Sequence, residues 1–373
     1  MNAVMTTQHD ALEGFLTELS DLYLWDTGSP EGLALSWCNL GSAKNIRLPG
    51  TPLIESGWVA GLLAKVREEH PKGDDDFAIE YDDMRFRGHR DYTVGGHLLA
   101  LRRQTMEVPL LSDLLLPTWW EELLLQRSLC KEGGLIVMAA ALGCGKSTTI
   151  AATIRSRLEA FAGHARCVED PPEMPLDGFW GDGVCVQCPV DSNSGKGAWG
   201  AVLRKMLRAY PSSTEGGQIL FIGEIRDADV AAEAIRAAVN GQLVITTIHA
   251  SSVITAIKRL IAFGANELSQ EVAQDMVASA LRLVMTQGLR RNPNPEAKGW
   301  HRRIIEGTVL ASTGDQHPVG MNIRDGKFHL LAQSFDRLRT LMAQSAPANR
   351  QRMGQGNLRQ LSVEDLLKET RTA

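Results

Sequence analysis

The sequence predicts an α/β protein with a mostly parallel sheet, preceded by a smaller α+β domain. Three observations predict it. The segment 135–149 passes from an apolar run into a glycine-containing loop and then into a helix-compatible stretch. Beyond it, apolar strand-like runs alternate with helical periodicities, which is typical of a parallel sheet covered by helices on both faces. The length of 373 residues favours two domains.

The composition excludes several classes of protein. With 44% hydrophobic and 22% charged residues, the chain is that of an ordinary globular protein. A net charge of -5 and a pI near 6.0 give no general attraction to nucleic acid or to anionic lipid. Six scattered cysteines fit a reducing compartment. Because we find no secretion signal and no run of about 20 apolar residues, we expect a cytoplasmic protein that meets a membrane only through partners.

The first hundred residues are expected to form the smaller α+β domain. Leu12, Phe15, Leu16 and Leu19 recur at helical spacing, so an amphipathic helix should open the chain. Apolar residues on one stripe predict a second helix over 55–69. The remaining elements expected here are strands over 21–25, 77–81, 83–89 and 98–103, with Val108 and Pro109 closing the domain.

The second domain is expected to alternate strands with helices. A leucine-rich helical stretch over 119–129 precedes the glycine-containing loop. A last helix, near the end of the chain, has Ser362 and Asp365 in a capping-box arrangement. Between them we expect strands over 165–168, 184–187, 219–222 and 243–248, and helices over 198–209, 229–239, 270–286 and 334–342.

The loop itself carries the residues that phosphate binding requires. Gly143 and Gly145 release the backbone, so that successive N–H groups at a helix N-terminus can surround a polyphosphate. Lys146 can reach the terminal phosphates, and the Ser147 hydroxyl can hold a magnesium ion. The pattern GxxxxGK(S/T) is complete except that Ala140 stands in place of its first glycine.

Three polar clusters follow three of the expected strands. They are residues 169–173, Glu224 with its neighbours Arg226 and Asp227, and His249. Since parallel strands end at one edge of a sheet, we expect all three clusters to meet at the loop. Phosphoryl transfer to water needs magnesium, a residue that positions the water, and cations for the departing phosphate. The carboxylates available to hold the magnesium shell and position the water are Glu169, Asp170, Glu173 and Glu224.

Four segments in this order, 140–149, 167–173, 219–227 and 241–250, resemble the Walker A, Asp, Walker B and His boxes of the GspE/PilT secretion ATPase superfamily. That superfamily powers type II and type IV secretion, pilus dynamics and conjugation. Residues 21–30 and 84–87 resemble its N-terminal PAS-like domain, and a single short domain of this kind resembles the PilT, Dot/Icm and conjugative branches. The resemblance implies a PAS-like α+β domain over 1–105, a linker over 106–112 and a RecA-like P-loop ATPase domain with C-terminal helices over 113–373.

The resemblance also implies roles for individual residues. His249 would sense the γ-phosphate, and Glu173 and Glu224 are both candidates for the residue that activates water. The implied magnesium ligands are Ser147, Asp170 and Glu224. The implied ATP-binding residues are Gly143, Cys144, Gly145, Lys146, Ser147, Thr148 and Thr149. Arginines of the first domain, each of which could instead be an ordinary surface cation, can reach the nucleotide in this family, and the candidates are Arg85, Arg87, Arg102 and Arg103.

Two residues depart from the family pattern. Ala140 replaces the first loop glycine, and Gln242 stands where the family often has the first histidine of the His box. Cys185 and Cys188 form a CxxC without a second pair, so we interpret them as small strand residues and not as a zinc site.

The function that the resemblance implies is that of a cytoplasmic, hexameric, magnesium-dependent ATPase that powers a type IV secretion or conjugative apparatus or a type IV pilus. Its partners would be inner-membrane and cytoplasmic components of that machine. One alternative is a RecA-like nucleic-acid translocase, against which stand the acidic pI and the lack of a basic, aromatic stripe. Another is a regulatory subunit that binds nucleotide without hydrolysing it, supported by Ala140 and Gln242 alone.

Overall fold

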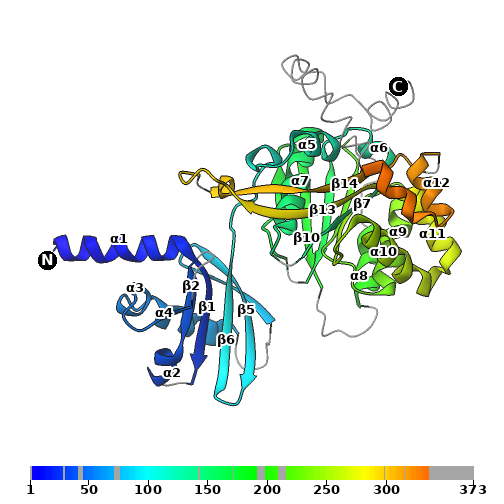
Figure 1. The fold of residues 1–373 in the computed structure, drawn as a ribbon. Helices are drawn as coiled ribbons and strands as arrows, with labels where there is room; N and C mark the ends of the chain where they lie inside the picture. The colour runs from blue at the N-terminus through cyan, green and yellow to red at the C-terminus, as the bar shows by residue number, and fades with distance from the viewer. Residues whose placement is uncertain are drawn as a thin grey trace. The chain divides into compact units, whose positions relative to one another are not determined.

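The chain divides into two compact units, Met1–Glu107 and Val108–Ala373, named unit 1 and unit 2 below (Figure 1). The computed structural model describes residues 2–27, 30–40, 45–70, 76–141, 143–170, 172–190, 198–208, 216–297, 299–314 and 316–335. Within these ranges no helix combines the length and the apolar character needed to span a bilayer. The helix expected over 334–342 extends past these ranges, and the one that contains Ser362 and Asp365 lies outside them.

Unit 1 is a six-stranded antiparallel sheet with helices on one face. The strand order is β3-β2-β1-β6-β5-β4. Alternate strand residues such as Leu22, Phe86 and Leu99 are buried together with the apolar stripe of α4, because the side-chain period of a strand is two. Its elements are α1 Asn2–Glu18, β1 Leu19–Asp26, α2 Pro30–Leu35, β2 Trp37–Leu40, β3 Ile46–Arg47, α3 Pro52–Glu55, α4 Trp58–Glu69, β4 Asp76–Tyr81, β5 Met84–Thr93 and β6 Gly96–Gln104.

Unit 2 is built on an eight-stranded sheet, which confirms the predicted α/β architecture with a mostly parallel sheet. The strand order is β14-β13-β7-β12-β11-β8-β10-β9. Every pair from β13 to β10 is parallel, whereas β14 and β9 at the two edges pair antiparallel. The strands are β7 Gly134–Ala139, β8 His164–Glu169, β9 Gly178–Trp180, β10 Gly183–Pro189, β11 Gln218–Ile222, β12 Leu243–Ile248, β13 Leu281–Arg291 and β14 Arg303–Ala311.

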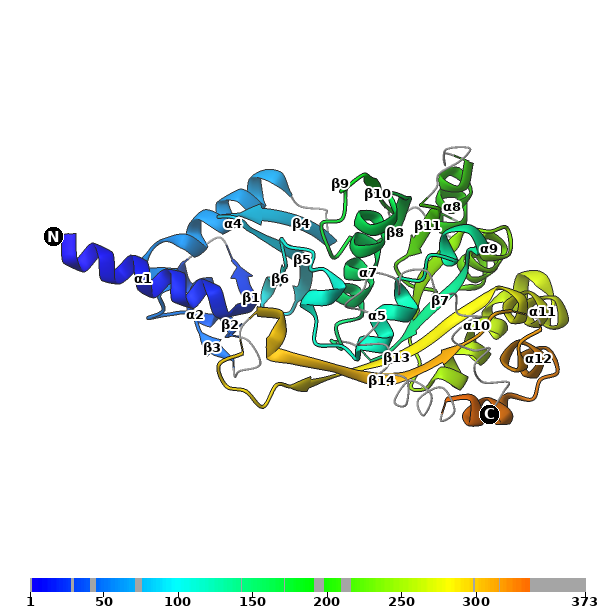
Figure 2. The same cartoon turned by 90° about the horizontal axis from the view of Figure 1, so that it is seen from above.

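Helices cover both faces of this sheet (Figure 2). Ile136 and Met138 of β7 pack in a core with α5 and α7, whereas Leu135 and Val137 pack on the other face with α8, α9, α10 and α11. All of β7 is therefore buried, as expected of a central parallel strand. The helices, with short 3₁₀ turns marked η, are η1 Leu111–Asp113, α5 Thr118–Leu124, α6 Leu129–Glu132, α7 Lys146–Phe161, α8 Ala198–Arg208, α9 Ala228–Val239, α10 Val253–Leu268, α11 Gln270–Ala280, η3 Gly299–Arg302, α12 Pro318–Arg324 and η4 Phe328–Leu330.

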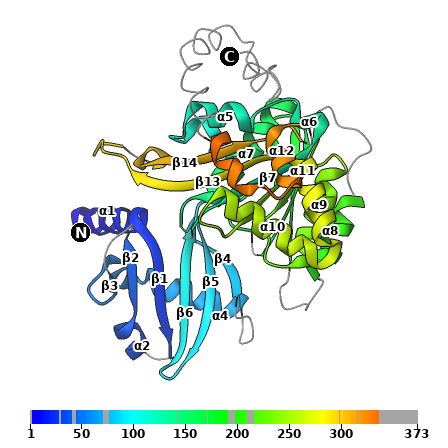
Figure 3. The same ribbon diagram turned by 45° about the vertical axis from the view of Figure 1, so that its right-hand side comes forward.

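Two predicted helices of unit 2 are wrong in extent. The helix expected over 119–129 ends at Leu124, and α6 is a separate short helix. The helix expected over 270–286 ends at Ala280, where the chain enters β13. Strand β13 lies between β7 and β14 (Figure 3), so backbone hydrogen bonds form along both of its edges. This pairing outweighs the local helical preference of residues 281–286.

The first residues of unit 2 are held against α7. Val108 and Leu111 are buried in the core on the α7 face of the sheet. The Arg155 guanidinium donates a hydrogen bond to the Val108 carbonyl, and the Leu111 N–H donates to the Ser156 hydroxyl at 2.9 Å. Residues 108–111 are therefore fixed to the helix that begins at the phosphate-binding loop.

Candidate nucleotide-binding site

The loop between β7 and α7 has the backbone shape that its glycines allow. Gly143 and Gly145 have φ values of +73° and +76°, in the left-handed region that residues with a Cβ avoid. Gly145 is also the N-cap of α7, so the helix starts directly at the loop and its first N–H groups have no partner within the helix. Such a terminus is a binding site for an anion.

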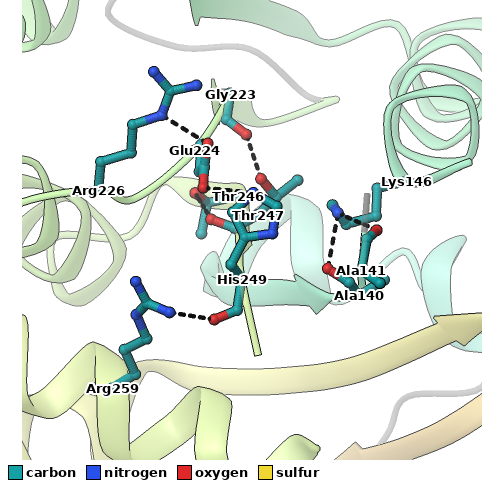
Figure 4. A network of polar contacts seen from close by, with 10 residues as sticks. All are labelled: Ala140, Ala141, Lys146, Gly223, Glu224, Arg226, Thr246, Thr247, His249 and Arg259. Atoms are coloured by element: carbon teal, nitrogen blue, oxygen red, sulfur yellow. Dashed lines mark hydrogen bonds and ion pairs between the residues drawn. The ribbon is translucent and has the colours of Figure 1, made fainter. Parts of the chain in front are cut away.

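Lys146, the first residue of α7, turns its ammonium group back over the loop. Its Nζ donates hydrogen bonds to the carbonyls of Ala140 and Ala141, both at 2.9 Å (Figure 4). Burial lowers the pKa of this ammonium, and the nearby carboxylates of Glu224 and Glu173 act in the opposite direction. The carboxylates from two other strand ends are therefore close enough to act on Lys146 electrostatically.

The segment after β8 places its carboxylates beside the first turn of α7. The Ser147 hydroxyl donates a hydrogen bond to the Glu173 carboxylate. Glu169, which is only 6% exposed, accepts a hydrogen bond from the Gln187 amide at 3.0 Å. Asp170 follows at the end of the strand and is half-buried. Glu169 thus belongs to the packed end of the sheet, whereas Glu173 is exposed beside the loop.

The ends of β11 and β12 are joined through Glu224. Its carboxylate accepts from Arg226 Nε at 2.7 Å and lies 3.1 Å from His249 Nε2. The Thr247 hydroxyl donates to the Gly223 carbonyl at 2.6 Å, and Arg259 of α10 donates to the His249 carbonyl at 2.7 Å (Figure 4). The backbones of these two strand ends are therefore linked as well as their side chains.

The three strand ends that carry the polar clusters thus lie at one edge of the sheet together with the loop, as predicted. Strands β7, β12, β11 and β8 are consecutive in the sheet, so their carboxyl ends form one edge.

The Ser147 hydroxyl and the Glu173 carboxylate supply oxygen donors of the kind that Mg²⁺ prefers. The described ranges contain no cluster of three His, Cys, Asp or Glu side chains suited to a metal. Mg²⁺ bound with a nucleotide needs only one or two protein oxygens besides phosphate, so the donors present fit it.

The remaining candidate loop residues lie on the first turn of α7. Thr148 is half-buried, whereas Thr149 is fully buried and its hydroxyl has no hydrogen-bond partner in the part of the chain that the structure describes. The Cys144 carbonyl accepts a hydrogen bond from the Gln287 amide of β13 at 2.7 Å. Thr149 therefore faces the core, and Cys144 contacts the sheet through its backbone.

The four candidate arginines of unit 1 do not share one environment. Arg85, Arg87 and Arg102 alternate with buried strand residues and lie on the polar face of the sheet, where Arg87 and Arg102 are directly opposite each other. Arg102 is 3.1 Å from Asp21. Arg103 lies on the helix-covered face and donates to the Leu16 and Thr17 carbonyls at the end of α1. Its guanidinium is thereby bonded within unit 1.

The departure at Gln242 lies far from this edge of the sheet. Gln242 precedes β12 and contacts Gln218 at the start of β11, whereas His249 follows the end of β12. At about 3.3 Å per strand residue, the six residues of β12 separate the two by about 20 Å. Gln242 therefore lies at the end of β12 opposite to His249 and the phosphate-binding loop.

Two residues at the site were missed by the sequence analysis. Gln287 lies on β13, in a segment expected to be helical up to residue 286, and Arg259 lies on α10, which was not predicted. The spacing of the apolar residues Val253, Ile257 and Leu260 is a helical signal that could have identified α10. No local signal pointed from Gln287 to a loop 143 residues away.

Known proteins resemble this chain in sequence and in fold. It is 31% identical to the Escherichia coli K12 protein YggR over 69% of this chain and 71% of that protein. It is 31% identical to the type IV pilus ATPase PilU of Pseudomonas aeruginosa PAO1 over 62% of this chain and 55% of PilU. Alignments with further curated relatives, including type II secretion system protein E of Klebsiella pneumoniae, cover 29% to 38% of those proteins.

Solved structures with the same fold include the pilus retraction motor PilT with bound ADP, with a TM-score of 0.65 and 23% identity over 96% of this chain and 95% of that one. The ATPase DotB of Legionella pneumophila has a TM-score of 0.58 and 22% identity over 89% of this chain and 88% of DotB. The family model described as type II/IV secretion system protein matches residues 78–364. Because that match extends over most of the sequence, the chain belongs to the type II/IV secretion system protein family, the superfamily of GspE/PilT-type secretion ATPases.

Proposed function

We propose that this protein is a hexameric ATPase that hydrolyses ATP to power a type IV secretion or conjugative apparatus or a type IV pilus. The observation that carries the proposal is the meeting of the phosphate-binding loop with two carboxylates: Glu173 accepts a hydrogen bond from Ser147, and Glu224 acts electrostatically on Lys146. Family membership supports the same activity. We further propose that the protein is cytoplasmic and reaches the inner membrane through components of that machine.

Each residue at this edge of the sheet has a role that follows from its chemistry. The loop N–H groups bind the β- and γ-phosphates, and Lys146 exchanges its bonds to the Ala140 and Ala141 carbonyls for bonds to phosphate. Ser147, with Asp170 and Glu224 nearby in the fold, is proposed to hold Mg²⁺, which when bound neutralises charge on the phosphates. Thr148 continues the helix beneath the nucleotide.

Glu173 and Glu224 are the two groups available to position the attacking water and accept its proton. Glu173 contacts Ser147 and is exposed, whereas Glu224 is held between Arg226 and His249 with its side chain only 18% exposed. A carboxylate fixed on two sides keeps its orientation, which favours Glu224 as the water-positioning group. His249 then connects that carboxylate to the end of β12 and is proposed to transmit the state of the γ-phosphate.

Unit 1 is proposed to be a PAS-like domain that supplies cations to the nucleotide. Arg85, Arg87 and Arg102 are the candidates, because they share the polar face of its sheet. Arg103 is a weaker candidate, since its guanidinium is engaged with the end of α1. Movement of the two units about the linker predicted over 106–112 is the proposed source of mechanical work. Because residues 108–111 are fixed to α7, we propose that the movement occurs at the first residues of that linker, 106–107.

The test is ATP hydrolysis by the purified full chain across a concentration series, with its mass in solution measured alongside. We expect magnesium-dependent turnover that rises as hexamers form. Lys146→Ala, Glu224→Gln and Glu173→Gln should each reduce it, by about 100-fold or more for the residue that positions water. Glu306→Gln, a change to an exposed carboxylate of β14, is the control and should leave turnover unchanged. Nucleotide binding without turnover, in a monomer indifferent to Glu224→Gln, would contradict the proposal.

A further inference from the structure

Strand β13 reaches the phosphate-binding loop with the side chains of Gln287 and Leu289, of which Gln287 is the polar one. The last pair between β13 and β7 is Thr286 with Ala139, so Gln287 stands next to the point where β7 becomes the loop. Gln287 is only 5% exposed, and its Nε2 donates a hydrogen bond to the Cys144 carbonyl at 2.7 Å. A Cβ placed on Gly145 would lie 3.2 Å from the same nitrogen, so the loop packs directly against this side chain.

The bond to the Cys144 carbonyl also fixes an N–H group. A trans peptide is planar, and its C=O and N–H point in opposite directions. The carbonyl of Cys144 and the N–H of Gly145 belong to the same peptide unit. When Gln287 holds that carbonyl toward β13, the Gly145 N–H must point away from β13. This N–H group is therefore oriented before a phosphate binds, which is what a preorganised anion-binding loop requires.

Only a hydrogen-bond donor can do this at position 287. A main-chain carbonyl accepts hydrogen bonds, so the amide nitrogen of Gln287 faces it. The other end of the side chain, Oε1, is buried and finds no partner in the part of the chain that the structure describes. The bond to Cys144 is therefore the polar contact that sets the orientation of this side chain.

We infer that Gln287 is a positioning residue for the phosphate-binding loop, which orients the Gly145 N–H through the Cys144 carbonyl. The inference rests on the proposed binding of nucleotide at this loop. Gln287 acts from a strand that carries none of the residues assigned to the reaction, and it makes nucleotide affinity depend on the seating of β13 against β7.

The test replaces Gln287 with its closest isostere and varies the pH. In Gln287→Glu a carboxylate faces the carbonyl, so the donor is lost at pH 8, and nucleotide affinity should fall by about tenfold or more. Because position 287 is buried, the pKa of the introduced carboxyl is raised. As the pH falls toward 5.5 this carboxyl takes up a proton and becomes an O–H donor, so affinity should recover relative to wild type. Gln287→Met has no hydrogen-bond donor at this position, so its nucleotide affinity should be lower than that of wild type at every pH.

The measurement is the dissociation constant of Mg²⁺-ADP for the full chain, from fluorescence titration with a labelled ADP between pH 5.5 and 8.5. Gln274→Glu is the matched control, because Gln274 of α11 also donates to main-chain carbonyls, those of Ile323 and Arg324, away from the loop. If wild type binds and Gln287→Glu binds equally well at pH 8, or shows no recovery at low pH, the inference is wrong. If wild type itself binds no nucleotide, it is the proposed function that fails.

Discussion

Arg155 of α7 offers a direct test of how the start of unit 2 is attached to the phosphate-binding helix. Its guanidinium donates to the Val108 carbonyl, pairs with Glu159 at 2.8 Å and stacks over the Trp180 ring at 4.8 Å. A charged hydrogen bond to a carbonyl contributes about 1.5–3 kcal/mol, an i,i+4 ion pair about 0.3–0.5 and a cation–π contact about 0.5–1. Since neighbouring contacts are not additive, we expect Arg155→Met to lower the free energy of unfolding by about 2–4 kcal/mol.

Two measurements check this prediction. Urea unfolding gives the stability change, and hydrogen exchange at the Leu111 amide, which donates to Ser156, reports whether residues 108–111 have detached from α7. The control is Arg290→Met, whose partner Glu306 is 60% exposed, so the change should stay within about 0.5 kcal/mol. A stability within about 0.5 kcal/mol of wild type for Arg155→Met, with unchanged exchange at Leu111, would refute the reasoning.

Three further predictions follow from single contacts. Burial raises the pKa of Cys38 from 9.0 to about 11, so the unfolded chain loses that proton first and stability should fall as the pH rises from about 9 to 11. Urea unfolding at pH 8 and 10.5 should show a smaller fall in Cys38→Ala, and equal falls would contradict the prediction. Thr247→Val removes the bond to the Gly223 carbonyl and should cost about 1 kcal/mol of stability and reduce turnover, whereas full activity would argue against coupling of the two strand ends. Gln242→His should leave nucleotide affinity and turnover unchanged in the same assays, because residue 242 lies at the opposite end of β12.

The central sheet could be predicted because strands buried on both faces appear in the sequence as short runs of mostly apolar residues. Strand β12 is a short run rich in apolar and β-branched residues with every residue buried, which is typical of a central parallel strand. Strands β2 and β3 were missed, since they have four and two residues and obtain their pairing from β1 and from each other. The helix-to-strand change at Leu281 was also missed, because it depends on partners far away in the sequence.

The candidate site, like the fold, could be predicted from the sequence only in part. Glu224 and His249 could be placed together without knowing the strand order, because carboxyl ends of parallel strands share an edge. The sequence shows that Arg226 lies two residues after Glu224, but it does not show that the two side chains form an ion pair. Gln287 could not be found, since its role comes from one bond between a strand and a loop that no periodicity connects.

The two departures from the family pattern bear on whether the protein hydrolyses ATP. A glycine is needed where φ is positive, as at Gly143 and Gly145, but Ala140 does not have a positive φ and its methyl group is buried. Its carbonyl still accepts a hydrogen bond from Lys146 at 2.9 Å. Gln242 lies at the far end of β12 from His249. Neither substitution therefore removes a group from the edge where the loop, Glu224 and His249 meet, and the regulatory-subunit alternative loses the two residues that supported it.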